Sequence, residues 1–184
     1  MRRMLPLPAI MIALSCCAPG HDLRPLPGLT GGEYHLAPGD VVRIITYGED
    51  PLTGEFRVSD QGRVALPLAG GVKASGRTSH QLEEAITAML RQRGMLTRPS
   101  VSVEVSAYRP IYVLGEVNKP GQYPYQPGMT MVSAAAVAGG FTYRAVQDYA
   151  SVVRTVDGDS VEGKVMRDGP IEPGDVITVF ERKF

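Results

Sequence analysis

The sequence predicts an α+β fold made of two small units, each with strands packed around one helix. The chain has 184 residues, with 21 Gly and 15 Pro spread along it as paired turn signals. That distribution is typical of short strands joined by tight turns. Only two segments favour a helix, and several others alternate apolar and polar residues as half-buried strands do.

Composition limits the classes of partner. The chain is 43% apolar and 21% charged, and its 19 basic residues balance its 19 acidic residues. Such values are typical of a soluble globular protein, and a balanced charge creates no overall field that attracts polyanions. We therefore expect no nucleic-acid partner.

Residues 1–16 are predicted to be a signal peptide. Arg2 and Arg3 precede the uncharged apolar run MLPLPAIMIALS, which has about the length of a signal-peptide core and is too short to span a bilayer. Cys16 and Cys17 follow and are the only cysteines. The alternative is a buried N-terminal segment or a disulfide between these neighbours, which would be a strained bridge.

The stretch ALSC resembles a bacterial lipobox, in which a small residue precedes the cysteine that is lipidated. Ser15 before Cys16 fits that rule, so Cys16 is the predicted lipidation site and Cys17 the alternative. By resemblance, the absence of Asp after Cys16 implies sorting to the outer membrane, where two or more acyl chains anchor firmly. Residues 17–32, rich in Pro and Gly without periodicity, predict a tether to the folded part.

The first unit, residues 33–109, opens with the phrase LAPGDVVRI. In the turn at residues 37–40, Pro38 pre-sets φ and Gly39 accepts the positive φ that a type II turn requires. Asp40 is expected to accept hydrogen bonds from local backbone N–H groups. The aliphatic residues that follow predict a buried strand.

Three further elements complete the first unit. Residues 56–70 predict a hairpin with its turn at residues 59–62 and alternating apolar residues on both arms. Residues 78–94 predict the clearest helix, because Thr78 begins a capping-box pattern and apolar residues recur three and four apart. Residues 100–108 alternate valine with polar residues, which indicates a half-buried strand.

The second unit is predicted to span residues 110–184, after a boundary at Arg109-Pro110. A hairpin is expected first, with a second type II turn that contains Pro120 and Gly121. A short helix of small residues, capped by Thr130, follows. Another hairpin is expected around residues 157–158.

The last strand is preceded by a second Pro-Gly-Asp phrase, formed by Pro173, Gly174 and Asp175. This repeat could indicate a duplicated domain or a pair of carboxylates in one active site. The two phrases match at few of their neighbouring positions, and Asp in a turn more often bonds to local backbone. We therefore interpret both phrases as type II turns that each begin a strand.

The sequence predicts a protein without enzymatic activity. The sequence contains no His-Glu-x-x-His, P-loop, G-x-G-x-x-G, G-x-S-x-G or paired-cysteine motif, and its three histidines share no motif. No catalytic, cofactor-binding or metal-binding residue is predicted. Tyrosine can stack on sugar rings, so Tyr112, Tyr123 and Tyr125 are candidate glycan contacts, although half-buried strand residues are the simpler interpretation.

The sequence resembles the outer-membrane polysaccharide export proteins of the Wza/GumB type. The first unit resembles their polysaccharide-export domain in the segments EYHLAPGDVVRI, FRVSDQGRVALPLAG, VKASGRTSHQLEEAI and RPSVSVEV. The second resembles their soluble-ligand-binding β-grasp (SLBB) domain in the segment VLGEVNKPGQYPYQPGMTMVSAAAVAGGF.

The resemblance implies a periplasm-facing, lipid-anchored outer-membrane protein that forms a homo-oligomeric ring. Such proteins meet an inner-membrane polysaccharide co-polymerase and pass capsular or exopolysaccharide outward, without a catalytic step. Longer members carry a C-terminal pore helix, whereas this sequence ends at VITVFERKF, so we expect a short form that makes a periplasmic collar. The alternative function is a periplasmic glycan- or cell-wall-binding module without a transport role.

Overall fold

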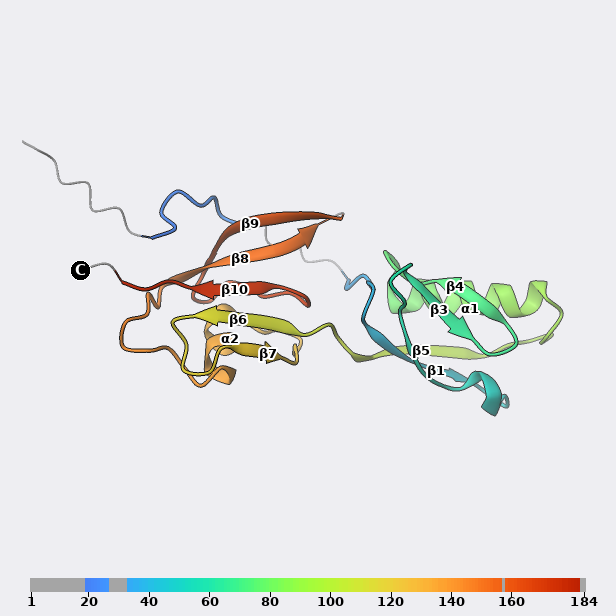
Figure 1. The fold of residues 1–184 in the computed structure, drawn as a ribbon. Coiled ribbons are helices and arrows are strands. Elements are labelled where there is room, and N and C mark those ends of the chain that lie inside the picture. Colours follow the sequence, from blue (N-terminus) through green and yellow to red (C-terminus); the bar gives the residue numbers. More distant parts are fainter. Residues whose placement is uncertain (1–18, 27–32, 157, 183–184) are drawn as a thin grey trace, which may run out of the picture.

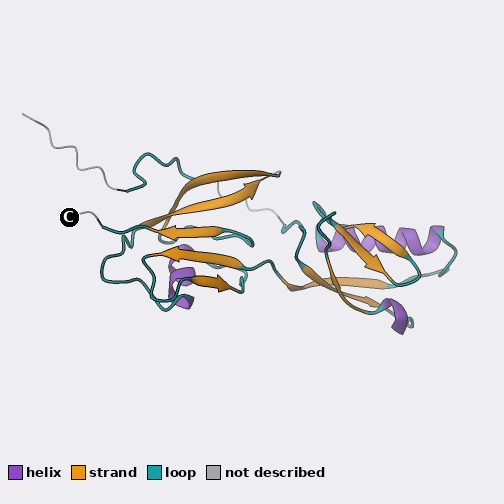
Figure 2. Ribbon diagram, in the orientation of Figure 1, coloured by secondary structure: helices purple, strands orange, loops and turns teal. Residues whose placement is uncertain are grey.

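The computed structural model describes residues 19–26, 33–156 and 158–182. These residues form two lobes joined at Arg109-Pro110, and each lobe combines strands with one α-helix (Figures 1 and 2). The predicted α+β plan of two units is confirmed. The predicted signal peptide and both cysteines lie outside the described residues.

The first lobe contains two small sheets and a helix. Its elements are β1 (Val41–Thr46), the 3-10 helix η1 (Asp50–Leu52), β2 (Gly54–Arg57), β3 (Arg63–Leu66), β4 (Gly70–Lys73), α1 (Ser79–Gln92) and β5 (Val101–Ala107). An antiparallel sheet has the strand order β2-β1-β5, and β3 pairs with β4 separately.

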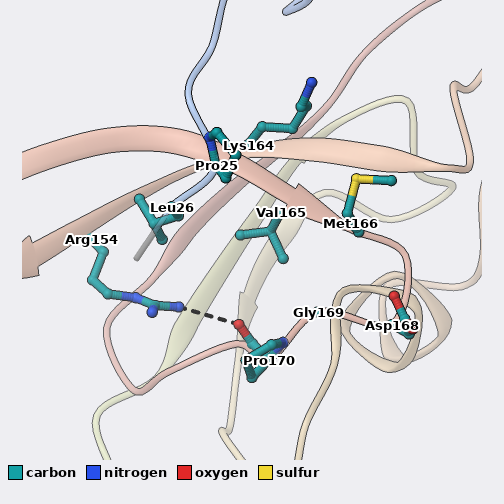
Figure 3. A pocket seen from close by; sticks show the side chains of 9 residues that line it. All are labelled: Pro25, Leu26, Arg154, Lys164, Val165, Met166, Asp168, Gly169 and Pro170. Atoms are coloured by element: carbon teal, nitrogen blue, oxygen red, sulfur yellow. Dashed lines mark hydrogen bonds between the residues drawn. The ribbon is translucent and has the colours of Figure 1, made fainter. Parts of the chain in front are cut away.

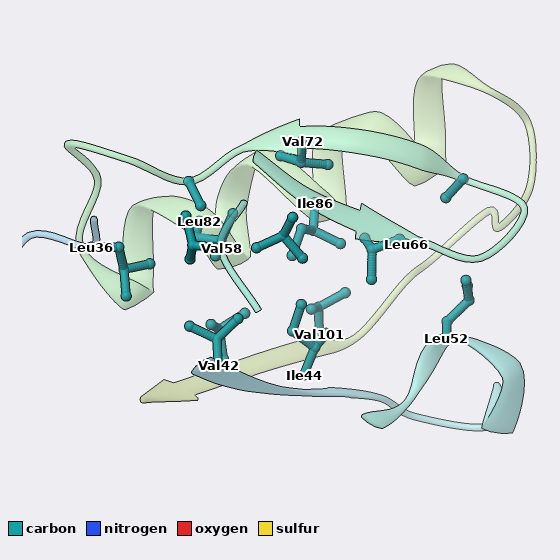
Figure 4. Packing of buried hydrophobic residues seen from close by; sticks show 14 of the residues in the cluster. Leu36, Val42, Ile44, Leu52, Val58, Leu66, Val72, Leu82, Ile86 and Val101 are labelled. Atoms are coloured by element: carbon teal, nitrogen blue, oxygen red, sulfur yellow. The ribbon is translucent and has the colours of Figure 1, made fainter. Parts of the chain in front are cut away.

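The core of the first lobe lies between the three-stranded sheet on one side and α1 with β3 and β4 on the other (Figure 4). Helix α1 begins where the sequence predicts, because Thr78 Oγ1 accepts the Gln81 N–H at 3.2 Å and Gln81 Oε1 accepts the Thr78 N–H at 3.1 Å. This reciprocal pair satisfies two N–H groups that a helix start leaves free. The helix buries Leu82, Ile86 and Leu90 on one face.

The hairpin predicted over residues 56–70 is wrong in its pairing. A turn does form at residues 59–62, where the Gly62 N–H donates to the Ser59 carbonyl at 2.9 Å. Beyond it, β2 joins β1 and β3 joins β4, because the two arms separate into sheets that enclose one core. Leu68, expected on the apolar face, has φ +60° in the turn after β3 and is 83% exposed.

The second lobe is a five-stranded mixed sheet with one helix. Its elements are β6 (Ile111–Gly115), β7 (Gly121–Tyr123), α2 (Met131–Val137), β8 (Tyr149–Val156), β9 (Asp159–Met166) and β10 (Val176–Val179). The strand order is β7-β6-β10-β8-β9, with β10 parallel to β6 and the other neighbours antiparallel. Helix α2 covers one face of this sheet (Figure 1).

The second predicted type II turn, around Pro120 and Gly121, is also wrong. Gly121 is extended at the start of β7, where it pairs with Val113 of β6. The loop before it holds the end of α2 instead of turning tightly. The Asn118 side chain donates to the Gly139 carbonyl at 2.8 Å, and the Lys119 N–H donates to the Ala138 carbonyl at 2.8 Å.

Residues 19–26 pack against the second lobe rather than forming only a tether. Next to Pro25, the Leu26 N–H donates to the Lys164 carbonyl of β9 at 3.0 Å, and the Lys164 N–H donates to the Arg24 carbonyl at 2.8 Å. The Pro- and Gly-rich sequence does not reveal this contact, because the pairing uses backbone groups. The segment covers the edge of β9, which would otherwise expose unpaired backbone groups.

Among the residues that the structure describes, no helix has the length and apolar character needed to cross a membrane.

Candidate functional site at the junction of the two lobes

The two Pro-Gly-Asp phrases have the same turn geometry. Gly39 has φ +100° and Gly174 has φ +90°, which is the region that the third residue of a type II turn occupies. The N–H groups of Asp40 and Asp175 donate to the carbonyl three residues earlier, at 3.2 and 3.1 Å. In both turns the Asp Oδ2 accepts the N–H of that earlier residue at 2.8 Å.

Each of these aspartates is fully buried and lies beside an arginine. Asp40 Oδ1 accepts the backbone N–H of Arg109 at 3.0 Å and lies 3.5 Å from Arg109 Nε. Asp175 accepts Arg154 Nε at 2.9 Å and Arg154 Nη2 at 2.6 Å, through different carboxylate oxygens. A buried carboxylate requires such partners, because an unpaired charge in a protein interior is strongly unfavourable.

The two turns, which are far apart in the sequence, meet at Arg109. A Cβ atom on Gly39 would lie 3.2 Å from Arg109 Cγ, and one on Gly174 would lie 3.4 Å from Arg109 Nη1. The Gly174 N–H also donates to the Pro110 carbonyl at 3.2 Å. The glycines thus supply the turn conformation and leave room for the Arg109 side chain between the lobes.

Three tyrosines continue this contact across the junction. Tyr108 packs edge-on against Tyr34 of the first lobe, with ring centroids 5.0 Å apart, and against Tyr125 of the second lobe at 5.4 Å. The Tyr34 hydroxyl donates to Asp40 Oδ2 at 2.7 Å. Burial, followed by this hydrogen bond to Asp40, raises the pKa of Tyr34, so its hydroxyl remains a donor at neutral pH.

The Arg154 side chain lies between two carboxylates. Besides Asp175, it forms an ion pair with Glu172, the residue that begins the second Pro-Gly-Asp turn. Burial raises the pKa of Glu172, and the charge of Arg154 opposes that shift. The cluster therefore joins β8 to the turn before β10 through charges that have little access to water.

The structure does not bring the three candidate glycan contacts together. Tyr112 is 41% exposed on the sheet face opposite α2. Tyr123 pairs with the buried Ile111 and therefore projects from the other face, where its hydroxyl donates to the Lys119 carbonyl at 2.5 Å. Tyr125 packs at the junction. The three rings do not form one stacking surface, and a role in glycan contact stays a prediction.

A pocket of about 330 Å³ lies beside the N-terminal segment (Figure 3). Arg154 Nη2 donates to the Pro170 carbonyl at 3.3 Å at its base, but the charge of Arg154 is already balanced by carboxylates. Lys164 extends its ammonium group away from the pocket, 5.5 Å from the Tyr149 ring centroid. The pocket walls are largely apolar, formed by Pro25, Leu26, Val165, Met166 and Pro170.

Within the described ranges, no group of three or more His, Cys, Asp or Glu side chains is arranged to hold a metal ion. The buried carboxylates Asp40 and Asp175 lie in separate turns, each with its own arginine, so they do not form the paired-carboxylate site considered from the sequence. What this junction can do is hold two α+β lobes in a defined arrangement.

The fold and junction define a tandem of two α+β domains, and comparison with known families identifies both. The family model for polysaccharide biosynthesis/export proteins matches residues 30–106, and the model for the SLBB domain matches residues 110–168. The chain therefore carries a polysaccharide export domain followed by an SLBB domain. The resemblance to outer-membrane polysaccharide export proteins is confirmed for both units.

Curated relatives have similar descriptions. The chain is 40% identical over 90 residues to the exopolysaccharide production protein ExoF of Rhizobium meliloti. The aligned region covers 48% of this chain and 21% of ExoF. It is 30% identical over 134 residues to the EPS I polysaccharide export outer membrane protein EpsA of Ralstonia nicotianae, and the aligned region covers 71% of this chain and 32% of EpsA. It is 28% identical over 112 residues to the polysialic acid transport protein KpsD of Escherichia coli, and the aligned region covers 59% of this chain and 20% of KpsD. The matches thus span about a third or less of these relatives.

Proposed function

We propose that this protein is a periplasm-facing outer-membrane lipoprotein that forms a ring and takes part in export of capsular or exopolysaccharide across the outer membrane. The ordered pair of a polysaccharide export domain and an SLBB domain carries this proposal. The partners that we propose are further copies of the chain, an inner-membrane polysaccharide co-polymerase and the exported polymer. No catalytic step is part of the proposal.

The position of residues 19–26 supports a specific orientation at the membrane. The Tyr149 hydroxyl of the second lobe donates to the Pro19 carbonyl at 2.8 Å, and Cys16 precedes Pro19 by three residues, which span about 10 Å at most. An acyl group on Cys16 would hold the second lobe next to the lipid surface. The first lobe, which lies at the other end of the molecule (Figure 1), would then project into the periplasm.

Deletion of the gene tests the transport role. We expect loss of surface polysaccharide while synthesis of the lipid-linked repeat units continues, because the proposed step follows synthesis. Surface polymer is measured by immunoblot of intact cells and repeat units by mass spectrometry of lipid extracts. Unchanged surface polymer would contradict export and favour the glycan-binding alternative. Expression of the gene from a plasmid provides the control.

Lipidation is tested separately with an alkyne-labelled fatty acid. We expect the wild type and Cys17→Ala to incorporate the label and Cys16→Ala to lose it, because the small Ser15 precedes Cys16. Label that persists in Cys16→Ala and disappears in Cys17→Ala would assign the anchor to Cys17. An unlabelled wild type would contradict the lipoprotein assignment.

A further inference from the structure

The five-stranded sheet of the second lobe has one face that α2 does not cover, which we call the open face. The N-terminal segment, residues 19–26, meets this face only near its end, where the Tyr149 hydroxyl donates to the Pro19 carbonyl. Helix α2 covers the opposite face (Figure 1), and cross-strand register places Tyr112, Val176 and Val153 in one row of neighbours on the open face. Leu114, 44% exposed, and Thr178 form the next row. The centre of this open face is therefore uncharged.

The other side of the same lobe is also uncharged. Helix α2 has the sequence MVSAAAV, without a charged residue, and buries Met131, Ala134 and Ala135 against the sheet. Its outer side presents Ala136 and Val137, of which Val137 is 47% exposed. A helix at a protein surface normally carries polar residues on its outer side, so this outer face of α2 is the kind that another protein surface covers.

Glu162, whose carboxylate accepts the Ser151 hydroxyl at 2.6 Å, and Lys119 carry opposite charges near the edges of the two faces. On the open face, Glu162 is the cross-strand neighbour of Val153. At the end of α2, the Lys119 side chain lies beside Gly139, with Cγ 3.5 Å from the position of a Cβ there. Lys164 also lies on the open face, but its ammonium group is held over the Tyr149 ring.

We propose that the open face of one copy of this chain binds the outer face of α2 on the next copy, an interface that rests on the ring assembly proposed above. The sheet separates the two faces within one lobe, so they can meet only between copies. The protruding Tyr112 and Leu114 match a surface of small Ala and Val side chains. Association through the edge of β9 is not available, because residues 24–26 pair with it.

Such contacts are heterologous, since each copy uses two different surfaces, and repetition of one heterologous contact closes a ring when the rotation permits. A two-fold dimer would instead place the same face against itself. This difference gives the interface a diagnostic test.

The test uses the full chain in a Cys17→Ser background with two single variants, Leu114→Cys and Val137→Cys, and a short bis-maleimide crosslinker. We expect neither variant alone to form covalent dimers, a mixture of the two to form them, and the double variant to form a ladder of higher oligomers. Gln61→Cys with Gln92→Cys, both exposed in the first lobe, is the control pair and should not crosslink. Dimers from Leu114→Cys alone, or assembly by native mass spectrometry without crosslinks in the mixture, would overturn the proposal.

Charge exchange provides a second measurement. Glu162→Lys and Lys119→Glu are each expected to weaken assembly in native mass spectrometry, and the double exchange to restore it, because every interface contains one of each residue. Failure of the double exchange to restore assembly lost in the single variants would overturn the proposed pairing of faces. A chain that remains monomeric in all variants would overturn the interface while leaving the deletion phenotype as an independent measure of the transport role.

Discussion

Replacement of Asp175 with asparagine is expected to destabilise the second lobe by about 3–5 kcal/mol, because it removes the fully buried carboxylate that accepts two hydrogen bonds from the buried Arg154. Arg154 is 4% exposed, so water cannot replace the lost carboxylate. Asparagine also cannot accept both Nε and Nη2 through two oxygens, as Asp175 does at 2.9 and 2.6 Å. Glu172 remains beside Arg154 and retains part of the pairing.

Urea unfolding of the full chain, followed by far-UV circular dichroism, measures this change in the free energy of unfolding. Asp168→Asn is the matched control, since it makes the same chemical change on an exposed residue of the same lobe, and it should shift stability by no more than about 0.5 kcal/mol. The combined replacement of Arg154 by Met and Asp175 by Leu is expected to cost less than Asp175→Asn, because both fully buried charges are removed and only the partly exposed Glu172 remains. Equal losses in Asp175→Asn and Asp168→Asn would contradict this account.

Local sequence signals predicted local structure well. The capping box at Thr78 and the Pro-Gly turn at residues 37–40 depend on residues within four positions of each other, and both turn and cap geometries are present. The alternation of residues 100–108 likewise appears as β5. Each of these patterns reflects a preference that the backbone has before the chain is folded.

Contacts between distant segments are not predicted by these local patterns. Nothing in either Pro-Gly-Asp phrase indicates that Gly39 and Gly174 both lie against Arg109. The clue that was available is chemical: a buried Asp needs a cation, and Arg109 stands at the predicted boundary between the units. The separation of β2 from β3 was missed for a similar reason, because alternation predicts which face of a strand is buried but not which strand it joins.

The long-range contacts at Arg109 matter for function because they fix how the two domains are joined. Each domain match ends or begins within a few residues of Arg109 and Pro110, so the link between two domains is also the point where both buried turns converge. A ring built from one lobe would transmit its geometry to the other only if this link is held. The Tyr34–Tyr108–Tyr125 series and the Asp40–Arg109 pair supply contacts that hold it.

The second large effect is expected for Gly115→Ala, at the end of β6. Gly115 has φ +81°, and a Cβ there would lie 2.1 Å from the Val179 carbonyl oxygen of β10. The obstructing atom belongs to the backbone of the parallel pair of β6 and β10, so relief requires these two neighbouring strands to separate. We expect a loss of about 3–5 kcal/mol, the sum of left-handed strain and forced overpacking.

Gly128 separates these two causes, because it has the same φ of +81° and nothing within 4 Å of a Cβ. Gly128→Ala should therefore show the strain alone, about 1–2 kcal/mol. Urea unfolding of both variants gives the difference, which measures the cost of the clash with Val179. Equal losses in the two variants would mean that β6 and β10 can move apart without penalty, and the close approach of these strands would then contribute nothing to the stability of the sheet.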